Sequence, residues 1–117
     1  MRKVFRRVFP ARDPQALDRQ YLGERGAAGC RVWVMSKDGV GSLTPRRPEP
    51  LSSFGWGRHG ALARELAWAL LHDCTGDPAL ADARCADLGS EVVARLPRES
   101  FSLDAKDVLL WLDAAGV

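Results

Sequence analysis

Cysteine and histidine are scarce in this sequence, which has three cysteines and two histidines in 117 residues. The cysteines Cys30, Cys74 and Cys85 are odd in number and include no Cys-x-x-Cys pair. Their spacing fits neither a disulfide framework nor a zinc site. We therefore expect reduced, mostly buried thiols, no metal site and no cofactor.

The sequence also lacks a long apolar run. No stretch approaches the roughly 18 consecutive apolar residues that cross a membrane. Residues 1–12 are basic but have no apolar centre of the kind found in secretory signals. We expect a cytoplasmic protein with no membrane partner. With 46% hydrophobic residues, the chain has enough apolar material for one core.

Residues that could form a catalytic site are equally few. His72 and Asp73 are neighbours in a predicted helix, so their side chains point about 100° apart and cannot form the base and orienting carboxylate of a triad. Cys74 is a neighbour as well and not a facing partner. We therefore predict no catalytic residue and expect a protein that acts by binding.

Charged residues, in contrast, are abundant and unevenly distributed. Residues 1–64 contain 13 Lys and Arg against 5 Asp and Glu, whereas residues 65–117 contain 4 against 10. A basic half can attract nucleic acid or an acidic protein surface. The alternative is that the two halves fold together and neutralise each other. Fourteen of the 17 cationic residues are arginine, which favours two-point contacts to carboxylate or phosphate.

Strand signals come first along the chain and helix signals follow. From Tyr21 the pattern turns to β, and residues 31–35 and 40–44 form a predicted hairpin. Three helices are predicted after it: residues 61–74, a helix from Asp77-Pro78 to Pro97, and one from near residue 102 or 104 to Gly116. We predict an α+β fold, in which a small antiparallel sheet, a hairpin plus one or two strands, packs against about three helices. Residues 20–117 form this single domain and residues 1–19 are a basic extension.

Large apolar residues indicate where the core lies. Trp56 and Leu66 are predicted to be largely buried, the first in an irregular loop and the second on the apolar face of the central helix. Trp68 is offset from the leucine stripe of that helix. We expect it to be buried, with an outward-facing anchor for a partner as the alternative.

The basic extension is the best candidate for partner binding. It interleaves cationic and aromatic residues, so arginines can pair with carboxylate or phosphate while phenylalanines supply apolar contact. The proline-rich stretch at residues 45–50 adds two arginines. The predicted partner-binding residues are Arg2, Lys3, Phe5, Arg6, Arg7, Arg46 and Arg47. We expect a protein partner, with nucleic acid as the alternative.

A second candidate site is the glycine-rich turn before the first helix. Gly55, Gly57 and Gly60 match the G-x-G-x-x-G spacing of dinucleotide-binding turns. The match is weak, because that turn follows a buried strand of a βαβ unit and here a proline-rich stretch precedes it. Free N–H groups at the helix start, with Arg58, His59 and Gly60, can instead bind a phosphate or carboxylate.

An ordered series of short motifs runs from Tyr21 to the end of the chain. It consists of Tyr21 and Gly23, Val32 and Val34, Phe54-Gly-Trp-Gly57, Gly60, Leu66-Ala-Trp-Ala-Leu-Leu71, Gly76-Asp77, Glu91-Val-Val-Ala-Arg-Leu-Pro97 and Trp111-Leu112. This series resembles a family of small bacterial and phage proteins known only as a domain of unknown function. After Phe-x-Trp-Gly the family usually has a small, glycine-rich run, where this chain has Arg58-His59 and Ala61-Leu62-Ala63.

The resemblance implies no activity, only an association with phages and mobile elements. Small proteins of such sources often act by occupying the surface of a host protein, and inhibitors of defence systems that target nucleic acid are a frequent type. By this analogy we expect a phage or mobile-element accessory protein that acts through protein–protein contact.

Overall fold

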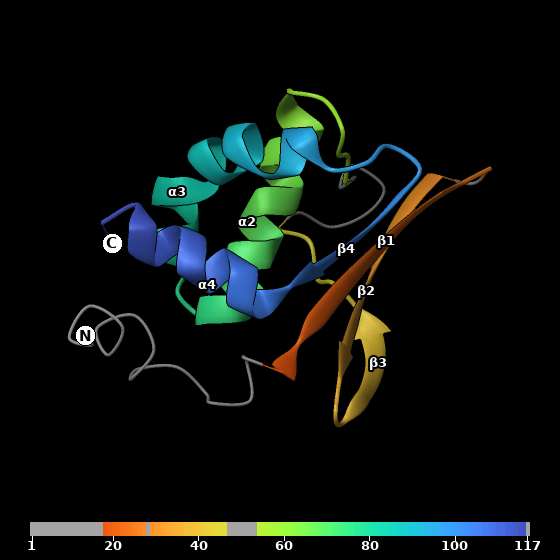
Figure 1. Cartoon of the computed structure of the whole chain (residues 1–117), viewed down its shortest axis with the longest axis horizontal. Coiled ribbons are helices and arrows are strands. Elements are labelled where there is room, and N and C mark those ends of the chain that lie inside the picture. Colours follow the sequence, from red (N-terminus) through yellow and green to blue (C-terminus); the bar gives the residue numbers. More distant parts are fainter. Residues whose placement is uncertain (1–17, 28, 47–53, 117) are drawn as a thin grey trace.

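The structure, a computed structural model, describes residues 18–27, 29–46 and 54–116. Within these residues it has two layers, an antiparallel sheet and a group of helices that covers one face of it (Figure 1). The elements are β1 (Gln20–Gly26), β2 (Gly29–Ser36), β3 (Gly39–Ser42), α2 (Ala61–Thr75), α3 (Pro78–Glu91), the 3-10 helix η2 (Val93–Arg95), β4 (Ser100–Asp104) and α4 (Ala105–Ala114). The predicted α+β fold class is confirmed.

The strand order in the sheet is β3-β2-β1-β4, and all neighbours are antiparallel. Tyr21 in β1 lies opposite Val34 in β2 and Leu103 in β4. Because side chains alternate along a strand, these residues share the face toward the helices. The last helix begins at Ala105, which confirms the predicted start near residue 104 and excludes the one near residue 102. Residues 100–104 form β4 instead, whose alternating Ser-Phe-Ser-Leu pattern pairs with β1.

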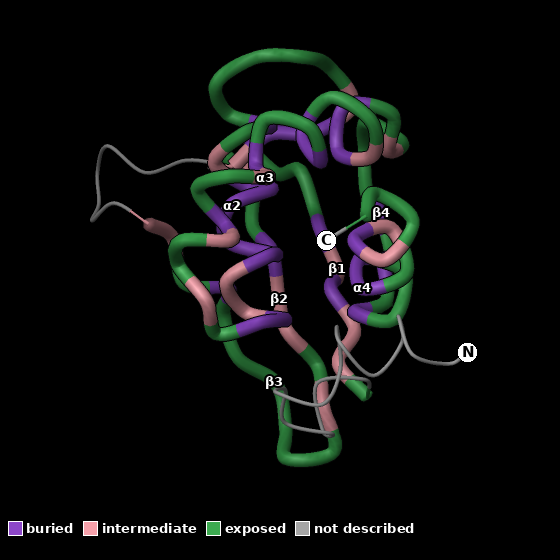
Figure 2. The backbone as a smooth tube through the Cα atoms, turned by 90° about the vertical axis from the view of Figure 1, so that its left-hand side faces the viewer, coloured by how far each residue is buried: buried purple, intermediate pink, exposed green. Residues whose placement is uncertain are grey.

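Helix α2 is central to the helical layer. Leu66, Leu70 and Leu71 on it are completely buried, and the buried stretches of the chain face one another between the two layers (Figure 2). Helix α3 approaches α2 closely at Gly89, where a Cβ atom would lie 3.3 Å from the Cα of Arg64. Glycine at this position therefore allows the two helices to pack.

The start of α3 follows its sequence signals, whereas its end does not. The Asp77 side chain accepts hydrogen bonds from the N–H groups of Ala79 and Leu80, and Pro78 occupies the first turn. The helix was expected to continue to Pro97. It ends instead at Glu91, and the chain continues through the short helix η2.

The predicted core residues are buried. Trp56 is 1% exposed, Leu66 is fully buried and Trp68 is 8% exposed, which confirms all three predictions. Cys74 and Cys85 are buried and Cys30 is half-buried, and none of the three forms a disulfide bond. Within the described ranges, no group of three or more His, Cys, Asp or Glu side chains is arranged to hold a metal ion. None of the helices described here has both the length and the apolar character needed to cross a membrane.

Candidate functional site

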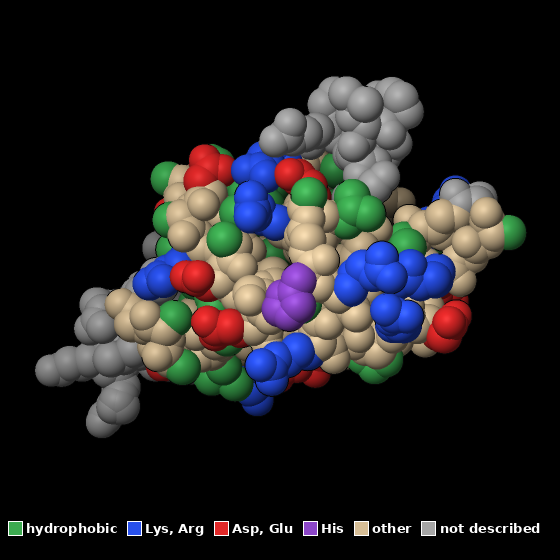
Figure 3. All heavy atoms as spheres, turned by 90° about the horizontal axis from the view of Figure 1, so that it is seen from above, with side chains coloured by type: hydrophobic (Ala, Val, Ile, Leu, Met, Phe, Trp, Pro, Cys, Tyr) green, Lys and Arg blue, Asp and Glu red, His purple; other side chains and the backbone are tan. Residues whose placement is uncertain are grey.

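A cleft of about 450 Å³ lies at the end of the molecule where α2 begins. Four segments that are distant in sequence form its walls: the β1–β2 hairpin, the loop before α2, the first turn of α2 and the loop after η2. Seen from this end, Lys and Arg side chains lie on several sides of a histidine, with Asp and Glu side chains also on this face (Figure 3). The polar lining includes Arg25, Arg58, His59, Arg98 and Glu99.

Two glycines fix the loop that precedes α2. The Gly55 N–H donates to the Leu62 carbonyl at 3.2 Å, and the Gly57 N–H donates to the Val93 carbonyl at 3.1 Å. Gly57 has φ +79°, and a Cβ atom on it would lie 2.7 Å from the Cγ of Arg98. Only glycine meets both requirements, so Gly57 is what lets this loop lie against Arg98.

Helix α2 begins at the cleft without a capping side chain. Gly60 is the N-cap residue with φ +140°, and the first helical hydrogen bond runs from the Arg64 N–H to the Gly60 carbonyl at 3.2 Å. The N–H groups of Ala61, Leu62 and Ala63 have no acceptor among the described residues, and all three residues line the cleft. Free N–H groups at a helix start attract anions.

Arg25 is held beside the cleft by neutral groups. Its Nε donates to the Arg98 carbonyl at 2.8 Å and its Nη2 to the Trp56 carbonyl at 3.2 Å. The guanidinium carbon lies 5.2 Å from the centre of the Trp56 ring. Because no carboxylate of the described chain pairs with Arg25, its positive charge is positioned but not neutralised.

Arg58, His59 and Arg98 are exposed at the rim of the cleft. No ion pair to any of them occurs within the part of the chain that the structure describes. Glu99 also lines the cleft and offsets part of the charge. Three arginines against one glutamate leave the cleft positive, as an anion-binding site requires.

Trp56, which also lines the cleft, carries an unpaired donor. Its indole Nε1 is buried and has no hydrogen-bond partner among the described residues. A buried donor without an acceptor is costly, and most such groups in folded proteins are paired. Because Nε1 is shielded from solvent, a ligand in the cleft reaches it only if neighbouring groups move.

The structure brings together the three residues of the predicted anion site, Arg58, His59 and Gly60, in one cleft. Arg25 and Arg98 were not predicted from the sequence. Arg25 and Arg98 lie close together because β1 pairs with β4. Just beyond the last residue pair of these strands, the backbone N–H of Arg25 donates to the Glu99 carbonyl at 3.0 Å. No local signal links two segments so far apart in the chain.

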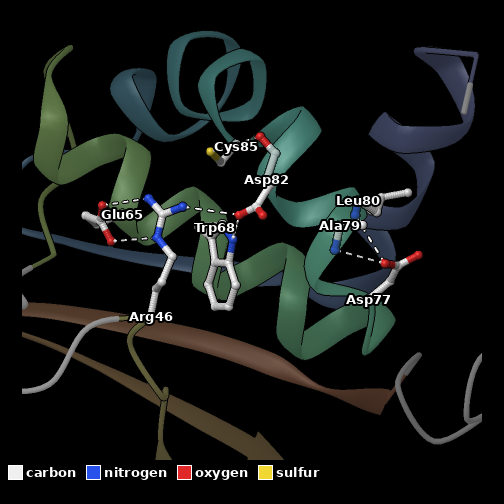
Figure 4. Close-up of polar contacts among 8 residues, drawn as sticks. All are labelled: Arg46, Glu65, Trp68, Asp77, Ala79, Leu80, Asp82 and Cys85. Atoms are coloured by element: carbon white, nitrogen blue, oxygen red, sulfur yellow. Dashed lines mark hydrogen bonds and ion pairs between the residues drawn. The ribbon is translucent and has the colours of Figure 1, made fainter.

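Arg46, one of the predicted partner-binding residues, lies in an intramolecular network (Figure 4). Its Nη2 donates to Glu65 at 2.7 Å and its Nη1 to Asp82 at 3.3 Å. The guanidinium lies over the Trp68 ring at 5.3 Å, and Trp68 Nε1 donates to Asp82 at 2.7 Å. Arg46 thus joins the segment after β3 to both α2 and α3.

Ion pairs between the two halves of the chain neutralise part of the uneven charge. Besides Arg46, Arg19 pairs with Asp73 at 2.8 Å. The described residues as a whole contain 11 Lys and Arg against 13 Asp and Glu. The remaining predicted partner-binding residues, Arg2, Lys3, Phe5, Arg6, Arg7 and Arg47, lie outside the described residues.

A second polar cluster lies between β1 and the end of α2. The Tyr21 hydroxyl donates to Asp73 Oδ2 at 2.6 Å and lies 3.1 Å from Cys74 Sγ, while Arg19 binds the same carboxylate. Burial raises the pKa of the Tyr21 hydroxyl, and the neighbouring Cys74 and Asp73 raise it further. His72 stacks on Trp68 at 4.8 Å instead of joining this cluster. The cluster ties the sheet to α2.

Comparison with known proteins gives one match. Neither a curated protein nor a solved structure matches the chain. A family of unknown function matches over residues 21–114, a range that includes the sheet except for Gln20, the cleft and all the helices described above. The chain therefore belongs to the family of unknown function DUF6166.

Proposed function

We propose that this protein acts by binding, without catalysis, and that its cleft receives an anionic group of a protein partner. The observation that carries the proposal is the convergence of positive charge on one cleft. Arg25, Arg58 and Arg98 meet there beside the uncapped start of α2, and no carboxylate of the described chain pairs with them.

The distribution of charge favours a protein partner over nucleic acid for this cleft. A nucleic-acid ligand presents a run of phosphates and is typically met by a basic stripe or face. The described part of the chain has more acidic than basic residues, 13 against 11, so its positive charge is local. A local site suits a single anionic group at a protein surface or chain end.

Nucleic-acid binding is the second candidate, and it rests on the segments outside the described residues. Those segments contain six Lys and Arg against two Asp and Glu, and most of the six lie in the basic extension at residues 1–19. Binding of this kind weakens steeply as salt increases, because phosphate contacts release counterions. Titration of a single-stranded and a duplex oligonucleotide at two salt concentrations tests it.

The biological role we attach to the proposed binding is that of a phage or mobile-element accessory protein. Inhibition of a host defence system that targets nucleic acid is the specific form we favour. Its support is the family resemblance of the motifs together with a site that suits binding. Capture of the partner from the native host, followed by mass spectrometry, tests whether that partner belongs to such a system.

Charge reversal at the cleft tests the proposed site. We expect the double variant Arg58→Glu and Arg98→Glu to bind the purified partner at least about tenfold more weakly, because it replaces attraction by repulsion. The matched control is Arg95→Glu with Lys106→Glu, which changes the net charge equally at exposed positions outside the cleft lining. Calorimetric titration measures the affinities, and melting temperatures verify folding. Equal binding by the two variants would show that the cleft is not the site.

A further inference from the structure

We infer that the group bound in the cleft is the terminal carboxylate of a polypeptide chain whose last side chain is apolar. This inference rests on the proposed function and narrows its ligand. Three features of the cleft carry it: the backbone donors at the start of α2, the apolar wall beside them, and the balance of charge at the rim.

The donors suit a carboxylate. The free N–H groups of Ala61, Leu62 and Ala63 leave the first turn of α2 together. A carboxylate has two oxygens that accept several hydrogen bonds, and capture of chain-terminal carboxylates by successive backbone N–H groups is an established mode of peptide recognition. Arg58 and Arg98 at the rim can add charge-assisted bonds.

The apolar wall lies next to these donors. The side chain of Leu62, in the first turn of α2, is 50% exposed. Phe54, which also lines the cleft, is half-buried. A Cβ atom at Gly55 would lie 2.8 Å from the Cβ of Leu62, so Leu62 rests directly on the loop backbone. A ligand that covers this leucine must carry an apolar group close to its anionic group. A polypeptide that ends in an apolar residue has this arrangement.

The charge and size of the cleft favour the end of a polypeptide chain over a phosphate group and over a folded protein surface. Glu99 in the lining repels a phosphate dianion more strongly than a carboxylate monoanion, while it can accept a backbone N–H from a peptide. A volume of about 450 Å³ falls within the range of sites for small ligands. It holds the end of a chain and not a folded surface.

Titration with small probes tests the inference on the intact protein. The probes are N-acetyl-Ala-Leu as the free acid, its C-terminal amide, N-acetyl-Asp-Glu amide, inorganic phosphate and a short single-stranded oligonucleotide. Binding is followed by the amide signals of residues 61–63 and the indole signal of Trp56 in ¹H–¹⁵N spectra. We expect the free acid to bind at least about tenfold more tightly than its amide, because the amide lacks the charge that the arginines bind.

Other results of this titration would contradict the inference, the proposed function or both. Tighter binding of phosphate or the oligonucleotide at the same signals would overturn the inference. If N-acetyl-Asp-Glu amide binds there as tightly as the free acid, the terminal carboxylate is not the feature recognised, and the proposed function survives with acidic side chains as its ligand. If no peptide probe moves these signals, both the inference and the proposed function are wrong.

Two variants test the backbone N–H donors of α2 and the apolar wall at Leu62 separately. Ala61→Pro removes one N–H at a helical position that favours proline, so the fold should remain intact while the free acid binds about fivefold more weakly. Leu62→Ser should reduce the preference for N-acetyl-Ala-Leu over N-acetyl-Ala-Gly, because it removes the apolar wall. Lys106→Glu on α4 is the control and should bind like the wild type. Wild-type affinity in the folded Ala61→Pro variant, or an unchanged preference in Leu62→Ser, would contradict the inference.

Discussion

The ring of Phe101 in β4 occupies the space that a side chain on Gly23 in β1 would need. The two residues lie opposite each other in the antiparallel pair. The same ring packs edge-on against Trp56, with the ring centres 4.9 Å apart and the planes at 78°. The absence of a side chain at Gly23 therefore lets the sheet hold Phe101, and Phe101 in turn supports the loop that forms the cleft.

Gly23→Ala should destabilise the protein by about 1–3 kcal/mol or more, because the added methyl group forces the Phe101 ring to move within a packed core. Urea unfolding measures the loss. Gly41→Ala in β3 is the matched control, since nothing lies within 4 Å of a Cβ atom there. Similar unfolding midpoints for the two variants would contradict this account of Gly23.

Arg46→Ala should cost about 1–3 kcal/mol of stability, because the change removes charged hydrogen bonds to Glu65 and Asp82. The exposed pair of Lys37 and Asp18, with nitrogen and oxygen 3.8 Å apart, gives the comparison. Lys37→Ala should cost at most about 1 kcal/mol. Urea unfolding of both variants decides the matter, and an Arg46→Ala loss no larger than that of Lys37→Ala would show that the network adds little to stability.

Stability should fall in alkaline solution because of Tyr21. Burial raises the pKa of its hydroxyl above the ordinary value of about 10. The unfolded chain therefore releases this proton first, so the contribution of Tyr21 is complete below about pH 10 and decreases as the pH rises, by about 1.4 kcal/mol per pH unit. Unfolding free energies between pH 8 and 11.5 measure the slope.

The chain has a single tyrosine, so its absorbance titration reports Tyr21 alone. We expect no tyrosinate signal from the folded protein at pH values where the unfolded protein shows it. Tyr21→Phe is the control and should lose the alkaline slope. Titration of the folded protein near the ordinary pKa of tyrosine would show that the hydroxyl is not buried as described.

Charge reversal in the basic extension, with Arg2, Arg6 and Arg7 all changed to Glu, should weaken partner binding strongly. The melting temperature should change little, because the sequence predicts that residues 1–19 are an extension outside the folded domain. His72→Ala should bind nearly as the wild type does. Calorimetric titration of the purified partner at two salt concentrations measures both. Normal binding by the triple variant, together with loss of binding in Arg58→Glu with Arg98→Glu, would restrict the site to the cleft.

Features that depend on neighbouring residues were predicted well. The start of α3 at Asp77 and Pro78 follows from capping, and the burial of Trp56 and Leu66 follows from their size and position in the pattern. The start of α2 after a glycine-rich turn also follows the sequence, whereas anion binding at Arg58 to Gly60 stays a prediction. These signals act within one or two helical turns.

Features that depend on distant segments were not predicted. The strand β4 was not predicted, because five residues give a weak strand signal and their partner β1 lies about eighty residues earlier in the chain. Arg25 and Arg98 were missed for the same reason. They share a cleft only once β1 and β4 have paired and the loop at Gly57 has packed against Arg98.

The sequence by itself determined the α+β class, the three helices and the buried aromatic core, since helix propensity, capping and apolar spacing are properties of short segments. Only the tertiary structure decided which arginines are neutralised by carboxylates and which are not. Arg46 looked free in the sequence and is paired with Glu65 and Asp82, whereas Arg25 is held by neutral carbonyls and keeps its charge. An ion pair depends on distances between groups, and the folding of distant segments sets those distances.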